Sequence, residues 1–137
     1  MRAVPASAEQ IQNVPIFADL DKKELDALVS SFKERTFEAG ETIASEGAGG
    51  IGFFIIGEGE AKVMRGDQEV ARLGPGDYFG ELALIDEGTR TATLVAESDM
   101  TCYGLTAWEF RPLVEGNSQI AWKLLQALAK QLREARS

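Results

Sequence analysis

The sequence contains no histidine among its 137 residues. Metal-dependent barrel enzymes, zinc hydrolases and serine or cysteine nucleophile sites all depend on imidazole, as a metal ligand or as a base near neutral pH. The absence argues against each of these classes, and against a metal-dependent enzyme built on a small β-barrel. We therefore expect a protein that is not an enzyme, with no metal site and no cofactor.

Cysteine is almost as scarce as histidine. The chain has one cysteine, Cys102, which cannot form an internal disulfide. It lies in "MTCYGL", a segment with the composition of a β-strand. We interpret Cys102 as a small buried hydrophobic residue in preference to a reactive thiol.

Long apolar runs and excess positive charge are also missing. The opening "MRAVPASAEQIQ" has no continuous apolar segment, and nowhere do about eighteen apolar residues follow one another. A cytoplasmic protein without membrane insertion is the expectation. The net charge of −8 and the pI near 4.6 repel a phosphate backbone. Nucleic acid is thus not an expected partner, and an anionic ligand must be held by local contacts.

What is present suits one globular domain, with 45% hydrophobic residues and only 4 prolines. In "DLDKKELDALVSSF", Asp21 and Glu24 have the spacing of a capping box, followed by an apolar helix face. That face consists of Leu25, Leu28, Val29 and Phe32.

Short β-rich runs separated by glycine extend from about residue 36 to 106 and predict a small antiparallel barrel or jelly roll. Gly57, Gly59, Gly74 and Gly76 are expected at its turns and bulges. "TAWEFRPLVEGNS" predicts a short helix that ends at Gly116, and Asn117 or Ser118 can cap a last helix. The predicted fold is mainly β: an antiparallel β-barrel of the double-stranded β-helix or jelly-roll type, flanked by an N-terminal helix and by C-terminal helices over about 107–136.

Three other motifs do not indicate chemistry. "GIGFFI" lacks the third glycine of a dinucleotide fingerprint and leads into a strand instead of a helix. "RGD" at residues 65–67 separates two β-rich runs, where it predicts a tight hairpin turn. Asp86 and Glu87 are interpreted as solvated loop residues and not as an acid–base pair.

The stretch "YFGELALIDEGTRTATLVA", residues 78–96, has the composition of an anion site. Gly80 permits close backbone approach, and "ELAL" predicts a short helix whose first amides can point at phosphate oxygens. Arg90 can supply a bidentate guanidinium to the same group. A ligand with a phosphate and free hydroxyls would use these groups together with Glu81 and Thr91.

This stretch resembles the phosphate-binding cassette of the cyclic nucleotide-binding domain family. "VPIFADLDKKELDAL", "FEAGETIASEG", "FFIIGEGEAKV" and the last helix follow the order of that family from about residue 14 to 135. The resemblance implies an N-terminal segment at 1–13 and a cyclic nucleotide-binding domain at 14–137. It also implies that cyclic AMP, in preference to cyclic GMP, is the ligand.

The resemblance assigns roles to individual residues. Glu81 would accept a hydrogen bond from the ribose 2′-hydroxyl. Arg90 would bind the phosphate, and Thr91 would bind the phosphate or the base. Trp122 would cover the base from the last helix, with packing of that helix on the barrel through Leu125 and Ala129 as the alternative. The predicted ligand-binding residues are Gly80, Glu81, Leu82, Ala83, Arg90, Thr91, Val63, Leu73 and Trp122, of which Val63 and Leu73 would form an apolar wall.

Other interpretations of the same residues stay open. Glu81 and Arg90 can form a plain surface pair, and the side chains of Leu82 and Leu84 are expected in the core. The last helix carries apolar residues at alternating spacings of four and three, which could pair two chains or pack on their own barrel. These residues are Ala121, Leu125, Leu128, Leu132 and Ala135.

Two functional classes follow. The first is a non-catalytic cyclic nucleotide sensor whose last helix moves on binding, to act on a protein effector or on a second copy. The second is an interaction or dimerisation module with a degenerate or different ligand site. Because the sequence stops at Ser137, after the last predicted helix and without the helix-turn-helix found in catabolite activator relatives, we do not expect direct DNA binding.

Overall fold

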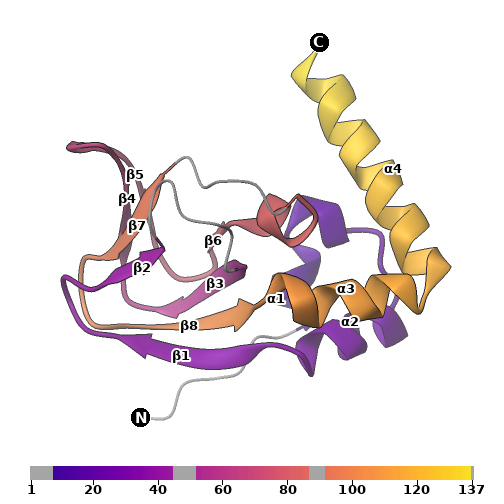
Figure 1. Ribbon diagram of the computed structural model, residues 1–137, viewed down its shortest axis with the longest axis horizontal. Helices are drawn as coiled ribbons and strands as arrows, with labels where there is room; N and C mark the ends of the chain where they lie inside the picture. Colours follow the sequence, from indigo (N-terminus) through magenta and orange to yellow (C-terminus); the bar gives the residue numbers. More distant parts are fainter. Residues whose placement is uncertain (1–7, 45–51, 87–91, 137) are drawn as a thin grey trace.

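The computed structural model describes residues 8–44, 52–86 and 92–136. Along the chain, most helices come before or after the strands, and in space these first and last helices gather on one side of the strands (Figure 1). The helical segments are α1 (Ala8–Gln12), η1 (Pro15–Phe17), α2 (Lys22–Val29), η2 (Glu81–Leu84), α3 (Ala107–Glu115) and α4 (Ser118–Ala135). The strands are β1 (Lys33–Phe37), β2 (Thr42–Ala44), β3 (Phe53–Glu58), β4 (Ala61–Arg65), β5 (Gln68–Leu73), β6 (Tyr78–Phe79), β7 (Thr93–Ala96) and β8 (Met100–Leu105).

These strands form two four-stranded antiparallel sheets, in the orders β1-β8-β3-β6 and β2-β7-β4-β5. Strands that are neighbours in space, such as β1 and β8, are far apart in the sequence, as a jelly roll requires. The predicted fold class, mainly β with flanking helices, is confirmed.

The interior is divided between two apolar clusters. One lies between the sheets and contains Phe54, Ile56 and Cys102, among others. The other joins η1, α2, α3 and α4 to the start of β3. There Phe53 contacts Phe17, with ring centroids 5.9 Å apart. The second cluster also contains a residue of η2, which places the cassette against the helices.

The predicted details of the barrel are confirmed where the structure describes them. Cys102 is fully buried in β8, and burial raises the pKa of its thiol to about 12, so it remains protonated near neutral pH. Gly66 and Asp67 turn β4 into β5. Gly59 has φ 87°, and a Cβ there would lie 2.5 Å from the carbonyl oxygen of Asp99, so glycine is required.

The helix boundaries follow local signals. Asp21 and Glu24 form the predicted capping box of α2, with both hydrogen bonds at 2.9 Å. Asn117 caps α4 by accepting hydrogen bonds from the amides of Gln119 and Ile120, and α3 ends at Gly116. None of the helices in the described ranges is both long and apolar enough to cross a membrane.

Thr106 begins α3 with a second capping box, in which its hydroxyl accepts the Glu109 amide at 3.2 Å. We expect Thr106→Ala to lower the free energy of unfolding by about 1 kcal/mol. The Glu109 amide loses its acceptor, and the Glu109 carboxylate, which accepts from the Thr106 amide, loses the hydrogen bond from the Thr106 hydroxyl. Urea unfolding measures the loss. Thr106→Ser keeps the hydroxyl and should stay within about 0.5 kcal/mol of the parent. Equal stability of Thr106→Ala and the parent would contradict the role of this cap.

Candidate functional site

The first part of the cassette is placed by pairing between β6 and β3. Phe79 lies opposite Phe54 and Tyr78 opposite Ile55, so Gly80 follows at the end of the strand pair. Gly80 has φ 86° and ψ 18°, a left-handed conformation that favours glycine, and it occupies the N-cap position of η2. Gly80 has no side chain that could cap this helix, and no side-chain cap is found there among the residues that the structure describes. The predicted short helix is confirmed, as a 3₁₀ helix.

Glu81 is the first residue of η2 and is partly buried. The pKa of nearby Tyr78 is raised, first by burial and then by the negative charges of Glu81 and Asp77. Tyr78 in turn contacts Phe53 edge to face, with ring centroids 6.1 Å apart. The carboxylate of Glu81 is therefore near enough to Tyr78 for its charge to act on the phenol.

The two leucines of η2 differ from the expectation that both are core residues. Leu84 is buried, as predicted, but the prediction for Leu82 is wrong because its side chain is 52% exposed. A 3₁₀ helix turns about 120° per residue, so residues two apart point in different directions. Ala83 lies between them in η2.

The predicted apolar wall is formed by neighbouring strands. Val63 is buried in β4, and Leu73 in β5 packs against the same cluster between the sheets. Leu73 lies opposite Ala61, whose side chain is on the same face as that of Val63. Both side chains thus face the interior of the jelly roll.

The cationic part of the predicted site lies outside the described residues. Arg90 and Thr91 belong to the stretch 87–91, and the structure describes the chain again from Ala92. Ala92 is buried in the same cluster as Val63. The residue that follows the predicted phosphate contacts therefore lies in the interior beside the apolar wall.

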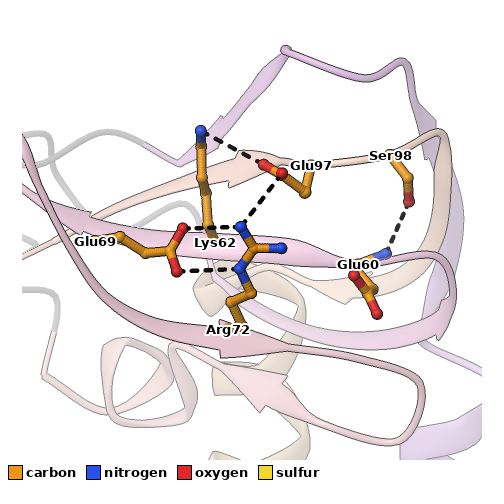
Figure 2. A network of polar contacts seen from close by, with 6 residues as sticks. All are labelled: Glu60, Lys62, Glu69, Arg72, Glu97 and Ser98. Atoms are coloured by element: carbon orange, nitrogen blue, oxygen red, sulfur yellow. Dashed lines mark hydrogen bonds and ion pairs between the residues drawn. The ribbon is translucent and has the colours of Figure 1, made fainter.

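A described cation close in sequence to this wall, Arg72, faces the other way. Figure 2 shows its guanidinium held by Glu69 and Glu97, with nitrogen–oxygen distances of 3.0 to 3.4 Å. Lys62, which pairs with Arg72 across the strands, also contacts Glu97, at 3.4 Å. Since Lys62 alternates with the inward residues of β4, this network is on the outer face. Arg72 is consequently engaged outside the barrel and is not the cation of an interior site.

Trp122 lies on α4 with 60% of its surface exposed. At about 100° per residue it points roughly opposite to Ile120 and Leu124, the buried residues of this helix turn. The alternative that Trp122 anchors α4 through Leu125 and Ala129 is wrong, because both of these are exposed as well. In this position of α4, Trp122 is on the outward face.

The distal part of α4 extends away from the body of the domain (Figure 1). Leu125 and Leu132 are 58% and 54% exposed, while Leu128 packs partly on the helical cluster. The alternative that the whole apolar stripe packs on its own barrel is therefore wrong for Leu125 and Leu132. A surface for a second chain stays a prediction.

Two features were missed by the sequence analysis. A groove of about 410 Å³ lies on the surface where η2, α3 and α4 meet. It is lined by Leu84, Ile85, Phe110, Val114 and Leu125, among others. Lys123 of α4 also contacts Glu24 of α2 at 2.7 Å. The capping box was visible in the sequence, but its partner lies 99 residues away and no local pattern reveals it.

Comparisons with known proteins agree with this geometry. The profile of the family described as "Cyclic nucleotide-binding domain" matches residues 34–117. This range contains all the described strands except the first residue of β1, and also contains the cassette and α3.

Two curated relatives are similar over much of the chain. The "Cyclic AMP receptor protein" of Thermus thermophilus is 35% identical over 126 residues, which is 88% of this chain and 58% of the receptor. The "cAMP-dependent protein kinase regulatory subunit" of Mycosarcoma maydis is 40% identical over 90 residues, 63% of this chain and 17% of the subunit. The chain thus spans little more than half of the first relative and less than a fifth of the second.

A solved structure is similar over nearly its whole length. The N-terminal domain of a transcriptional regulator from Streptomyces coelicolor A3(2) has a TM-score of 0.84 and 32% identity, covering 92% of this chain and 94% of that one. The similarity therefore extends to the flanking helices as well as the sheets.

Proposed function

Because the chain belongs to the cyclic nucleotide-binding domain family, we propose that it is a non-catalytic sensor of a cyclic nucleotide, of cyclic AMP in preference to cyclic GMP. The observation that carries the proposal is the cassette: Gly80 in its left-handed conformation leads directly into η2 and Glu81, and Phe79 just before it packs against the same cluster as Val63 and Leu73. Relatives named for cyclic AMP and a relative named for cyclic GMP both occur, so titration with the two nucleotides tests the preference.

The chemistry assigns one partner to each part of the ligand. A cyclic monophosphate has one phosphate charge, a ribose 2′-hydroxyl and a flat base. Arg90 and the amides at the start of η2 would bind the phosphate, Glu81 would accept the 2′-hydroxyl, and the apolar wall would contact ribose and base. Thr91 would add a hydroxyl to the phosphate or the base.

A route from this site to the last helix is supported by packing. Leu84, at the end of η2, belongs to the same buried cluster as Phe110 of α3 and Leu124 of α4. A shift of η2 on ligand binding would change the surface against which α3 and α4 pack. Because a close-packed interior does not deform continuously, the two helices would have to repack. We propose that binding repositions α4, which then acts on a protein effector or a second copy of the chain.

Self-association through α4 would use the stripe formed by Ala121, Leu125, Leu128, Leu132 and Ala135. Its exposed leucines on a projecting helix are the arrangement that a second helix can cover.

Titration calorimetry with cyclic AMP, cyclic GMP and 5′-AMP tests the proposal. We expect saturable binding of cyclic AMP, weaker binding of cyclic GMP, and the weakest binding of 5′-AMP, whose phosphate is not fixed in a ring. An interaction module with a degenerate site would give no heat with any of the three. Tighter binding of 5′-AMP than of cyclic AMP would indicate a different ligand class.

Trp122 provides a further test. If α4 turns toward the bound base, Trp122→Ala should lose about 1 to 3 kcal/mol of nucleotide affinity through lost stacking. In the Trp108→Phe protein, where Trp122 is the remaining tryptophan, emission should change as nucleotide is added. Unchanged affinity together with unchanged emission would leave Trp122 as an outward surface residue and require a different lid.

A further inference from the structure

Glu24 is a carboxylate in an unusual position, because only 6% of the residue is exposed. Its Oε1 atom accepts two hydrogen bonds, from the Asp21 amide at 2.9 Å and from the Lys123 ammonium at 2.7 Å. A buried carboxylate is costly unless a cation and hydrogen bonds compensate it. Lys123 supplies that cation from a helix 99 residues further along the chain.

Lys123 is itself held on several sides. Its side chain is 24% exposed, and its Nζ atom lies 4.0 Å from Asp21 Oδ2 in addition to the Glu24 contact. The pKa of Lys123 is raised, chiefly by the hydrogen bond with Glu24 and further by the charges of Glu24, Asp21 and Asp19. The ammonium of Lys123 therefore stays charged at neutral pH.

The contact is built onto the start of α2. Glu24 closes the capping box with Asp21, whose other carboxylate oxygen accepts the Glu24 amide. The carboxylate of Glu24 thus accepts hydrogen bonds both at the start of α2, from Asp21, and from Lys123 in the second turn of α4. Loss of Lys123 would leave Glu24 buried with a single neutral donor, which weakens the cap as well as the contact between the helices.

Apolar packing alone does not fix the position of α4 in the same way. Ile120 and Leu124 share a buried cluster with Leu25 and Leu28 of α2. Such packing is non-directional, whereas the contact of Lys123 with Glu24 joins one specific pair of atoms at 2.7 Å. A shift of α4 that preserves much of its apolar contact would still separate Lys123 from Glu24.

We propose that Glu24 and Lys123 form a clamp that fastens α4 to α2, so that the two helices change position together. Lys123 and Glu24 are positioning residues in this role. The response of the clamp to nucleotide rests on the proposed sensor function, whereas the clamp itself does not.

Hydrogen exchange of the ligand-free protein tests the clamp directly. Lys123→Met keeps the apolar stem and removes the charge, so we expect exchange to rise by about tenfold or more both in the first turns of α4 and in the first turn of α2. Exchange in β8 should stay unchanged. Lys130→Met, which removes an exposed lysine from the same helix, should leave all three regions unchanged. A rise in α4 without a rise in α2, or no rise in either, would overturn the clamp.

A double-variant cycle covers the case in which Lys123→Met loosens the whole domain and β8 also loses protection. Glu24→Gln keeps an acceptor for the Asp21 amide but removes the buried charge. In Glu24→Gln/Lys123→Met, the clamp predicts an effect clearly smaller than the product of the two single effects, because both variants remove the same contact. An effect equal to that product shows independent residues and overturns the proposal.

Exchange in the presence of cyclic AMP tests joint movement. In the parent protein, nucleotide should alter exchange in α2 and α4 together, and in Lys123→Met it should alter α4 with a reduced change in α2. A parent protein in which α4 responds and α2 does not would contradict joint movement. Absence of calorimetric binding contradicts the sensor function instead, and the ligand-free comparison still decides the clamp.

Discussion

Replacing Arg90 by alanine is expected to weaken binding of cyclic AMP by about 30-fold or more, since a desolvated charge pair is worth about 2 to 5 kcal/mol. The guanidinium can form two parallel hydrogen bonds to the cyclic phosphate, and the chain's net charge of −8 offers no general attraction in its place. Calorimetric titration of parent and variant measures the loss, and the unfolding midpoint should barely change.

Arg72→Ala is the matched control for this prediction. Arg72 lies on the outer face of the β4–β5 hairpin and is engaged by Glu69 and Glu97, so its removal should leave nucleotide affinity unchanged. The pair of variants separates a local contact from a general change in charge. If Arg90→Ala binds as tightly as the parent, or if Arg72→Ala loses as much, the proposed phosphate site is wrong.

Glu81→Gln is expected to weaken binding of cyclic AMP by about tenfold or more, because hydrogen bonds to charged groups contribute about 1.5 to 3 kcal/mol. The 2′-deoxy analogue has no hydroxyl to donate, so its affinity should change little. Calorimetry with both ligands on both proteins measures the difference. Glu81 is partly buried at the start of η2, directly after the left-handed Gly80.

Asp86→Asn controls for the change of charge in the same segment. Asp86 is exposed and follows η2 closely, so it alters the local field without a direct role in the site. Both ligands should bind the Asp86→Asn protein as they bind the parent. Equal losses for cyclic AMP and its deoxy analogue in Glu81→Gln would exclude a ribose contact and leave Glu81 as a residue of the helix start.

The cassette illustrates how far the sequence predicts a site. Gly80, Glu81 and a short helix at "ELAL" are recognisable from residue type and spacing, and the structure contains that helix directly after a left-handed glycine. The exposure of Leu82 was not predictable in the same way. Its position depends on the tighter turn of a 3₁₀ helix and on which neighbour covers each side.

The sequence by itself determined the features that depend on residues a few positions apart. The capping box of Asp21 and Glu24, the hairpin at Gly66 and the buried strand around Cys102 each depend on residues a few positions apart, and each is present. The alternation of short β-rich runs and glycines likewise determined the antiparallel class, since side-chain period and turn chemistry are local properties.

Only the tertiary structure decided the environment of individual side chains. It placed Trp122 on the outer face of α4, put Arg72 among carboxylates outside the barrel, and brought Lys123 to Glu24 across 99 positions. Each of these outcomes depends on which distant element covers a given face. Which distant element covers a given side chain is a property of the assembled layers, and no pattern within a single helix or strand specifies it.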